Sequence, residues 1–204
     1  MAGVIGDLNQ GLTSLLDAMA KQTMASAKVR FSVIGFSDTA SCRLPMSHLR
    51  DVNEMPKLSA YNTTSYVAAF QHLRKQIPID VAALIAAGNQ VHRPAVFFLT
   101  DGLPNEEDWP GALAELKSPE FRERPNILAF GVGNADPETI VRIATSAEYA
   151  YQAAEGADTG RAIARVCESL TRSIVNSGNA LASGKAELVG ERPEGFRLAA
   201  DLLT

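Results

Sequence analysis

A single carboxylate follows the most apolar stretch of the chain. Residues 95–99 read AVFFL, and Thr100, Asp101 and Gly102 come directly after them. A continuous apolar run of this kind predicts a strand that is covered on both faces. Gly102 allows the chain to turn sharply as it leaves that strand. Because a charge at the end of a buried strand needs a partner, Asp101 is a candidate binding residue.

A second candidate loop carries small hydrogen-bonding side chains. Asn62, Thr63, Thr64 and Ser65 stand directly before a predicted helix. The ordinary interpretation is that Thr64 or Ser65 caps that helix. The functional interpretation follows from a property of open α/β sheets, in which ligands bind outside the carboxyl ends of the strands. On that interpretation the loop and Asp101 lie at one edge of the sheet.

The segments that must position these loops alternate between strand and helix. Helical patterns cover 3–24, 65–76, 79–91, 112–117, 137–146 and 158–177, and strand patterns cover 29–36, 40–44, 95–99, 127–132 and 147–152. Pro78 is expected to separate the second helix from the third. The alternation predicts an α/β fold with a doubly wound, mainly parallel sheet and helices on both faces. We predict one domain over 1–178 and a tail over 179–204 that holds one short strand or helical turn.

Composition excludes several classes of protein. The 204 residues carry 19 Lys and Arg against 23 Asp and Glu, a net charge of −4, and no basic stripe, which argues against a nucleic-acid partner. No apolar run approaches the roughly 20 residues of a membrane span, and the first residues lack a secretion signal, so we expect no membrane partner and a cytoplasmic protein. The two cysteines are far apart and have no C-x-x-C spacing, which predicts buried free thiols. The three histidines lack metal-ligand spacing, so we do not expect a zinc site.

Several segments together resemble the von Willebrand factor type A family. They are the strand that ends in T-D-G at Gly102, the TSYVAAF helix start at 64–70, the strand that ends at Phe36 and Ser37, and F-G-V-G at 130–133. The resemblance covers about residues 1–176. Within the family, LNQGL, VRFSVIGFSDTA and FFLTDGLPN are most similar to the bacterial tellurite-resistance type. The resemblance implies a Rossmann-like fold and a non-enzymatic protein-binding module in a tellurite or stress-response system.

The resemblance also implies a metal-ion-dependent adhesion site. In that site Mg²⁺ or Mn²⁺ is held by oxygens from three loops and is shared with an acidic residue of a partner protein. Thr64 matches the second-loop threonine and Asp101 the third-loop aspartate, but the first-loop D-x-S-x-S has no counterpart. Because Mg²⁺ requires octahedral oxygen coordination, binding is expected to be weak or absent in this chain. The remaining residues of the predicted partner-binding rim are Ser37, Asp38, Asn62, Thr63, Ser65, Asn105 and Trp109. For Trp109, packing within its own loop is the alternative.

The same resemblance implies that the first, central strand of the sheet is missing. The burial of about six apolar residues contributes as much free energy as a whole domain has in net stability, so a monomer with an empty central slot is not expected to persist. Three alternatives stay open. The chain starts further upstream, a tail segment at 186–189 or 196–198 fills the slot, or a partner or second copy completes the sheet. The tail segments are short and carry Glu187 and Arg197, which disfavours burial.

An enzyme is the alternative of a different class. The predicted loops offer hydroxyls and carboxylates at Ser37, Asp38, Thr64 and Asp101, but they contain no histidine, no G-x-S-x-G elbow and no P-loop. The two glycines of 131–133 are a weak match to a nucleotide-binding loop. The sequence therefore favours a binding module. The second alternative is a structural or assembly protein with a degenerate site that binds no metal.

Overall fold

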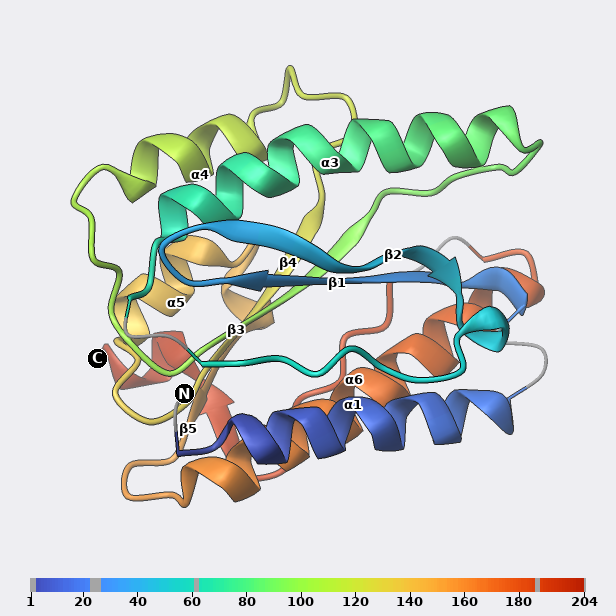
Figure 1. Cartoon of the computed structure of the whole chain (residues 1–204). Coiled ribbons are helices and arrows are strands. Elements are labelled where there is room, and N and C mark those ends of the chain that lie inside the picture. The colour runs from blue at the N-terminus through green and yellow to red at the C-terminus, as the bar shows by residue number, and fades with distance from the viewer. Residues whose placement is uncertain (1–2, 23–26, 61–62, 186–187, 204) are drawn as a thin grey trace.

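Strands in the middle of the molecule lie between two layers of helices (Figure 1). The computed structural model describes residues 3–22, 27–60, 63–185 and 188–203. The strands are β1 (Arg30–Phe36), β2 (Ala40–His48), β3 (Ala95–Thr100), β4 (Asn126–Gly131), β5 (Ala150–Ala153) and β6 (Phe196–Leu198). The α-helices are α1 (Ile5–Ala20), α3 (Tyr66–Ala86), α4 (Trp109–Lys117), α5 (Pro137–Ile143) and α6 (Thr159–Ala182). Short 3₁₀ helices are η1 (Leu49–Asp51), η2 (Ala147–Tyr149) and η3 (Ala199–Leu202).

The strands form two separate sheets. β3, β4 and β5 run parallel, and β6 lies antiparallel on β5. β1 and β2 form an antiparallel hairpin that makes its own two-stranded sheet. The predicted class is confirmed, since the molecule is α/β with a mostly parallel sheet and helices on both faces. No ladder joins β1 to β3 in the described part of the chain, so the hairpin and the main sheet are not hydrogen-bonded to each other there.

β4 shows how the two helical layers are held to the sheet. All but one of its residues are fully buried, as expected for a strand covered on both faces. Its side chains alternate, so Ile127 and Ala129 pack in the cluster that contains α3, α4 and α5, whereas Leu128 and Phe130 pack against α6. α1 lies on α6 and extends that second layer (Figure 1). Among the described helices, none combines the length and apolarity needed to cross a bilayer.

The prediction that Pro78 separates two helices is wrong. α3 is one helix from Tyr66 to Ala86 with Pro78 inside it. A proline in a helix interior removes one backbone hydrogen bond and costs about 3 kcal/mol. The helix continues because Phe70, Leu73 and Ile77 are buried in the core on the turns before the proline. Tertiary packing of these side chains therefore outweighs the tendency of proline to end a helix.

α1 and α6 approach each other closely at a glycine. A Cβ on Gly11 would collide with the Sγ atom of Cys167, so only glycine allows this contact. Cys167 is a buried free thiol, as predicted, and its burial raises the pKa to about 11. Cys42 is half-buried and also free. Cys167 is therefore a packing residue in its protonated form.

The C-terminal segment returns to the main sheet. Phe196 and Leu198 pair with Ala153 and Tyr151 of β5, so 196–198 does not lie between β1 and β3, and this alternative, which the sequence already disfavoured, is excluded. The physical reason is length. The three residues of β6 are enough to pair with the short strand β5, but they are too few to pair along the six residues of β3. Of the other tail segment, residues 186–187 lie outside the described residues, and the Val189 N–H donates to Ser177 Oγ of α6 at 2.9 Å.

The N-terminus of α5 offers a test of local stability. Asp136 caps this helix, because its Oδ2 accepts hydrogen bonds from Thr139 N at 2.9 Å and Thr139 Oγ1 at 2.7 Å. Replacing Asp136 with alanine is expected to lower the free energy of unfolding by about 1 kcal/mol in urea denaturation. Asp136→Asn is the matched control, since asparagine caps nearly as well. An equal loss in both variants would contradict the capping role.

Candidate functional site

The candidate site lies where β1 and β3 end. Both strands run in the same direction, so the loops after Phe36 and Thr100 meet at one edge of the molecule (Figure 1). The segment that precedes α3 reaches the same edge, because the Ser65 N–H donates to the Ser37 carbonyl at 2.6 Å. We call this edge, formed by residues 37–39, 63–65 and 101–105, the carboxyl rim.

Backbone hydrogen bonds tie the loops of the carboxyl rim to one another. The Asn105 N–H donates to the Thr64 carbonyl at 3.1 Å, which joins the second loop to the third. The Asn134 N–H donates to the Asp101 carbonyl at 3.2 Å, and this joins the third loop to the segment after β4. Gly133, at φ +58°, permits that turn beside Asp101. Gly133 thus supports the Asp101 loop, whereas Gly131 leaves room for Gln152 and Ile140, with which a Cβ would collide.

Thr64 and Asp101, the two residues matched by resemblance, lie at the same edge. Both line one continuous cavity that opens at the carboxyl rim. Ser65 is the cap of α3, because its side chain accepts a hydrogen bond from Ala68 N at 3.0 Å. The hydroxyl of Thr64 takes no part in that cap. Both residues therefore belong to one edge of the molecule, and their role in a metal site stays a prediction.

Tyr66 is the residue of this region that sequence reasoning missed. Its ring is fully buried against Phe36, Phe98 and Trp109. Its hydroxyl donates to the Gly102 carbonyl at 2.8 Å and lies 3.0 Å from Thr100 Oγ1. Burial raises the pKa of Tyr66 to about 12, so the hydroxyl stays a donor. One feature of the sequence could have indicated this role. Tyr66 is the first residue of a helix whose buried face is otherwise apolar, and a buried tyrosine hydroxyl needs a hydrogen-bond partner.

Ser37 and Asp38 form the first-loop part of the rim. The Ser37 hydroxyl donates to Asp38 Oδ1 at 2.8 Å, and this hydrogen bond lowers the pKa of the Asp38 carboxyl. Asp38 is exposed and Ser37 is buried. The rim therefore presents ionised Asp38 to solvent on the loop beside Thr64.

The predicted rim needs one correction. Trp109 is only 5% exposed and packs between Phe70, Tyr66 and the guanidinium of Arg142, so it is a core residue and no partner anchor. Burial of its large apolar ring under α3 is more favourable than exposure of that ring to solvent. Thr63 and Asn105 are exposed, as a partner-binding surface requires. Asn62 lies outside the described residues.

The donor set at the rim does not form a complete magnesium site. Thr64, Asp101 and Asp38 supply oxygen, which is the ligand type that Mg²⁺ prefers. Among the described residues, however, no group of three histidine, cysteine or acidic side chains lies close enough to hold a metal ion. With only a hydroxyl and two carboxylates from the protein, water would have to fill most of the octahedral coordination positions of Mg²⁺. These residues could contribute to a cation site, but they do not fit one by themselves.

The fold is similar to that of known solved structures. Two crystal forms of proximal thread matrix protein 1 from the mussel byssus, a protein with a von Willebrand A-like fold, superpose on this chain with a TM-score of 0.56 and 16% and 17% sequence identity. Each match covers 83% of this chain and 42% of the mussel protein, so the chain spans less than half of that relative. No family model matches the sequence, and no curated protein matches it. The likeness shows the fold alone.

The hydroxyl of Tyr66 offers a test of how the rim is held. Replacing Tyr66 with phenylalanine removes the 2.8 Å donor of the half-buried Gly102 carbonyl and leaves it the longer hydrogen bond from Thr100 Oγ1 at 3.3 Å, so we expect the free energy of unfolding to fall by about 1 kcal/mol. We also expect faster hydrogen exchange at residues 101–105. Tyr151→Phe is the matched control, because Tyr151 is also buried, at 4% exposed, and its hydroxyl makes no hydrogen bond within the described ranges. Unchanged exchange in Tyr66→Phe would show that this hydroxyl does not hold the loop.

Proposed function

We propose that this chain is a non-enzymatic protein-binding module of the von Willebrand A type, and that the carboxyl rim is its binding surface. One observation carries the proposal: hydrogen bonds tie the loops after β1 and β3 and the segment before α3 into one edge that exposes Asp38, Thr63 and Asn105. A surface that is ordered before binding loses little conformational entropy when a partner docks.

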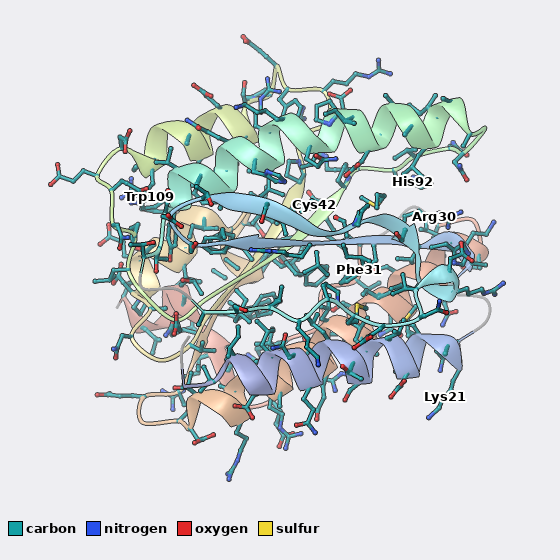
Figure 2. All side chains as sticks on the ribbon, in the orientation of Figure 1. Lys21, Arg30, Phe31, Cys42, His92 and Trp109 are labelled. Atoms are coloured by element: carbon teal, nitrogen blue, oxygen red, sulfur yellow. The ribbon has the colours of Figure 1, made fainter. Side chains whose placement is uncertain are left out.

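The chemistry of the rim supports binding over catalysis. Its described polar side chains are hydroxyls, carboxylates and an amide, and Leu103 adds an exposed apolar side chain. His48 pairs with Arg30 at the start of β1, and His92 precedes β3, so both lie at the opposite edge (Figure 2). The third histidine, His72, lies within α3, beyond the helix's first turn at the rim. A hydroxyl nucleophile at the rim would therefore lack a histidine base beside it. The non-enzymatic character of the module is inferred from this arrangement.

The bacterial tellurite or stress-response setting is part of the proposal and rests on the resemblance of three segments. The VRFSVIGFSDTA segment forms β1 and the turn that leads into β2. The FFLTDGLPN segment forms the end of β3 and the third loop of the rim. In proteins of this type, an acidic residue of the partner reaches the rim through a shared cation. Thr64 and Asp101 are the residues of this chain that would face such a cation.

A site-specific cross-linking experiment tests the binding surface. A photoreactive benzoylphenylalanine at Thr63 is expected to capture a partner protein in cells of the source organism, and the same group at Arg122, exposed just before β4 at the opposite edge, is expected to capture none. The Thr63 adduct should fall at least tenfold when Asp101→Asn is added. Adducts of equal yield at both positions, or adducts insensitive to Asp101→Asn, contradict the proposal.

Calorimetry separates the binding module from the alternative of a structural or assembly protein with a degenerate site. Titration with MnCl₂ is expected to give a weak heat that Asp101→Ala abolishes, because few protein oxygens contact the ion. Asp108→Ala is the matched control, since Asp108 is an exposed carboxylate that makes no cap hydrogen bond. Identical traces for wild type and Asp101→Ala would favour the degenerate site, with any partner binding independent of metal.

A further inference from the structure

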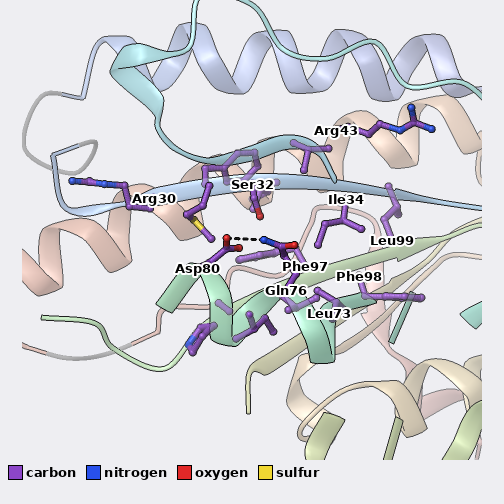
Figure 3. Close-up of a pocket in the computed structure, with 18 of the residues that line it drawn as sticks. Arg30, Ser32, Ile34, Arg43, Leu73, Gln76, Asp80, Phe97, Phe98 and Leu99 are labelled. Carbon is purple, nitrogen blue, oxygen red and sulfur yellow. Dashed lines mark hydrogen bonds between the residues drawn. The ribbon is translucent and has the colours of Figure 1, made fainter. Parts of the chain in front are cut away.

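The second half of α3 is apolar on all sides. Residues 81–87 read VAALIAA, and Pro78 and Ile79 come before them, with Asp80 as the one charged side chain of 78–87. Asp80 points inward, toward the cavity between the sheets, where its Oδ1 accepts a hydrogen bond of 2.9 Å from Gln76 Nε2 (Figure 3). A helix that is apolar all round is normally buried all round. The outward side of this half is therefore expected to have a partner.

The outward side of this half is exposed instead. It extends past the end of α4, the helix that lies beside the first half of α3 (Figure 1). Its two isoleucines are 61% and 55% exposed, its alanines are exposed, and its proline is half-buried. We call this surface the outer arc, and it consists of Pro78, Ile79, Ala82, Ala83, Ile85 and Ala86.

The outer arc differs from the outward side of the other long helix. In α6, every exposed residue from Arg161 to Asn179 is polar. The outer arc is therefore a local feature of α3 and not a general property of the surface. Exposed apolar side chains that are contiguous on a surface mark an interaction site.

The spacing of the outer arc matches a second copy of itself. Ile79 precedes Ala82 by three residues and Ile85 follows it by three, so at about 100° per residue they lie on opposite flanks of Ala82. When two such helices pack antiparallel with Ala82 opposite Ala82, Ile85 of one copy comes level with Pro78 of the other. Ile79 comes level with Ala86 in the same way. Each large side chain thus meets a smaller one, and the central alanines let the helix axes approach to about 8 Å.

Lys75 supplies charge complementarity in the same arrangement. It is exposed, and within the described ranges it forms no ion pair with a carboxylate. The last turn of α3 contains no basic residue, although a cation there would stabilise the partial negative charge of the helix end. In the antiparallel pair, Lys75 of one copy comes level with residues 88–89 of the other, directly after that helix end. Each copy therefore supplies the cation that the helix of the other copy lacks.

We propose that the outer arc binds the outer arc of a second copy of this chain, with the two α3 helices antiparallel and Ala82 at the two-fold axis. One helix face buries less than the roughly 800 Å² per partner of stable complexes, so the dimer is weak. Because α3 begins at the carboxyl rim, the rims of the two copies lie at opposite ends of the helix pair. The dimer thus offers two rims. The interface is separate from the binding surface proposed at the rim and does not depend on it.

Other occupants match the outer arc less well. A helix that lies on a membrane surface is rich in lysine and arginine, which attract it to anionic lipids. In α3, Lys75 is the one exposed cation, and the whole chain has a net charge of −4. A different protein would not need an arc with matching residues at equal distances on both sides of Ala82.

Sedimentation velocity tests the pairing directly. The average mass of the wild-type chain is expected to rise toward that of two chains as its concentration increases. Ala82→Glu is expected to weaken association at least tenfold, because it buries two carboxylates against each other at the two-fold axis. Ala20→Glu is the matched control, since Ala20 is an exposed alanine of α1 in the opposite helical layer, and it should associate like the wild type. A wild-type chain that stays monomeric throughout, or equal losses in the two variants, would overturn the proposal.

Disulfide trapping tests the direction of the helices. A residue at the two-fold axis meets its own copy, so mild oxidation is expected to cross-link Ala82→Cys into a dimer. A mixture of Ile79→Cys and Ala86→Cys is expected to cross-link as well, and neither of these variants alone. Wild type gives the background from its own free thiols, Cys42 and Cys167. In a parallel pair, positions 79 and 86 lie about 10 Å apart along the helix, so a mixture that stays unlinked while Ala82→Cys is linked would overturn the antiparallel direction.

Charge reversal tests the contact at the helix end. Lys75→Glu is expected to weaken the dimer several-fold, because it places a negative charge beside the C-terminus of the partner's helix. Lys21→Glu makes the same change in net charge at an exposed cation directly after α1, and it is expected to have no effect. Equal weakening by both variants would mean that net charge acts, and it would overturn the role of Lys75.

Lipid vesicles test the alternative occupant. In co-sedimentation with vesicles of phosphatidylcholine and phosphatidylserine, the wild-type chain is expected to stay in solution. If it binds the vesicles, Ile79→Asp releases it, and sedimentation velocity finds monomers only, then a lipid surface covers the outer arc and the proposed second copy is wrong.

Discussion

The N-terminus of α3 holds the loops of the carboxyl rim together. Ser65 ties this helix to the loop after β1 through Ser37, and Tyr66 ties it to the loop after β3 through Gly102. The tyrosine ring also packs on Phe36 and Phe98, one from each sheet. Within the described residues the two sheets share no ladder, so the cap residue Ser65 and the first residue of α3, Tyr66, link them at the carboxyl rim.

Much of the fold could be predicted because it depends on local patterns. The apolar run AVFFL identified β3, and the alternation of helices and strands identified the parallel sheet. Asp101 and Thr64 could be singled out because they follow or precede strongly patterned elements. Pro78 misled the prediction, since local chemistry ends a helix there and the burial of Phe70 and Ile77 continues it.

The rest of the site depends on contacts between residues far apart in the sequence. Trp109 follows three acidic residues, which is typical of an exposed loop, and only the placement of α4 under Tyr66 and Phe70 buries it. The role of Tyr66 depends on Gly102, 36 residues away. No short-range pattern contains such a pair, so the sequence could indicate the rim's loops but not the groups that fix them.

The contact between Gly11 and Cys167 decides how closely the two outer helices can lie. A hydrogen atom and a thiol share a space that would not admit even a methyl group. The two positions therefore form a single steric unit, and a designer who wished to place any side chain at the first would have to shorten the second at the same time. The tolerance of each position to substitution is thus a property of the pair.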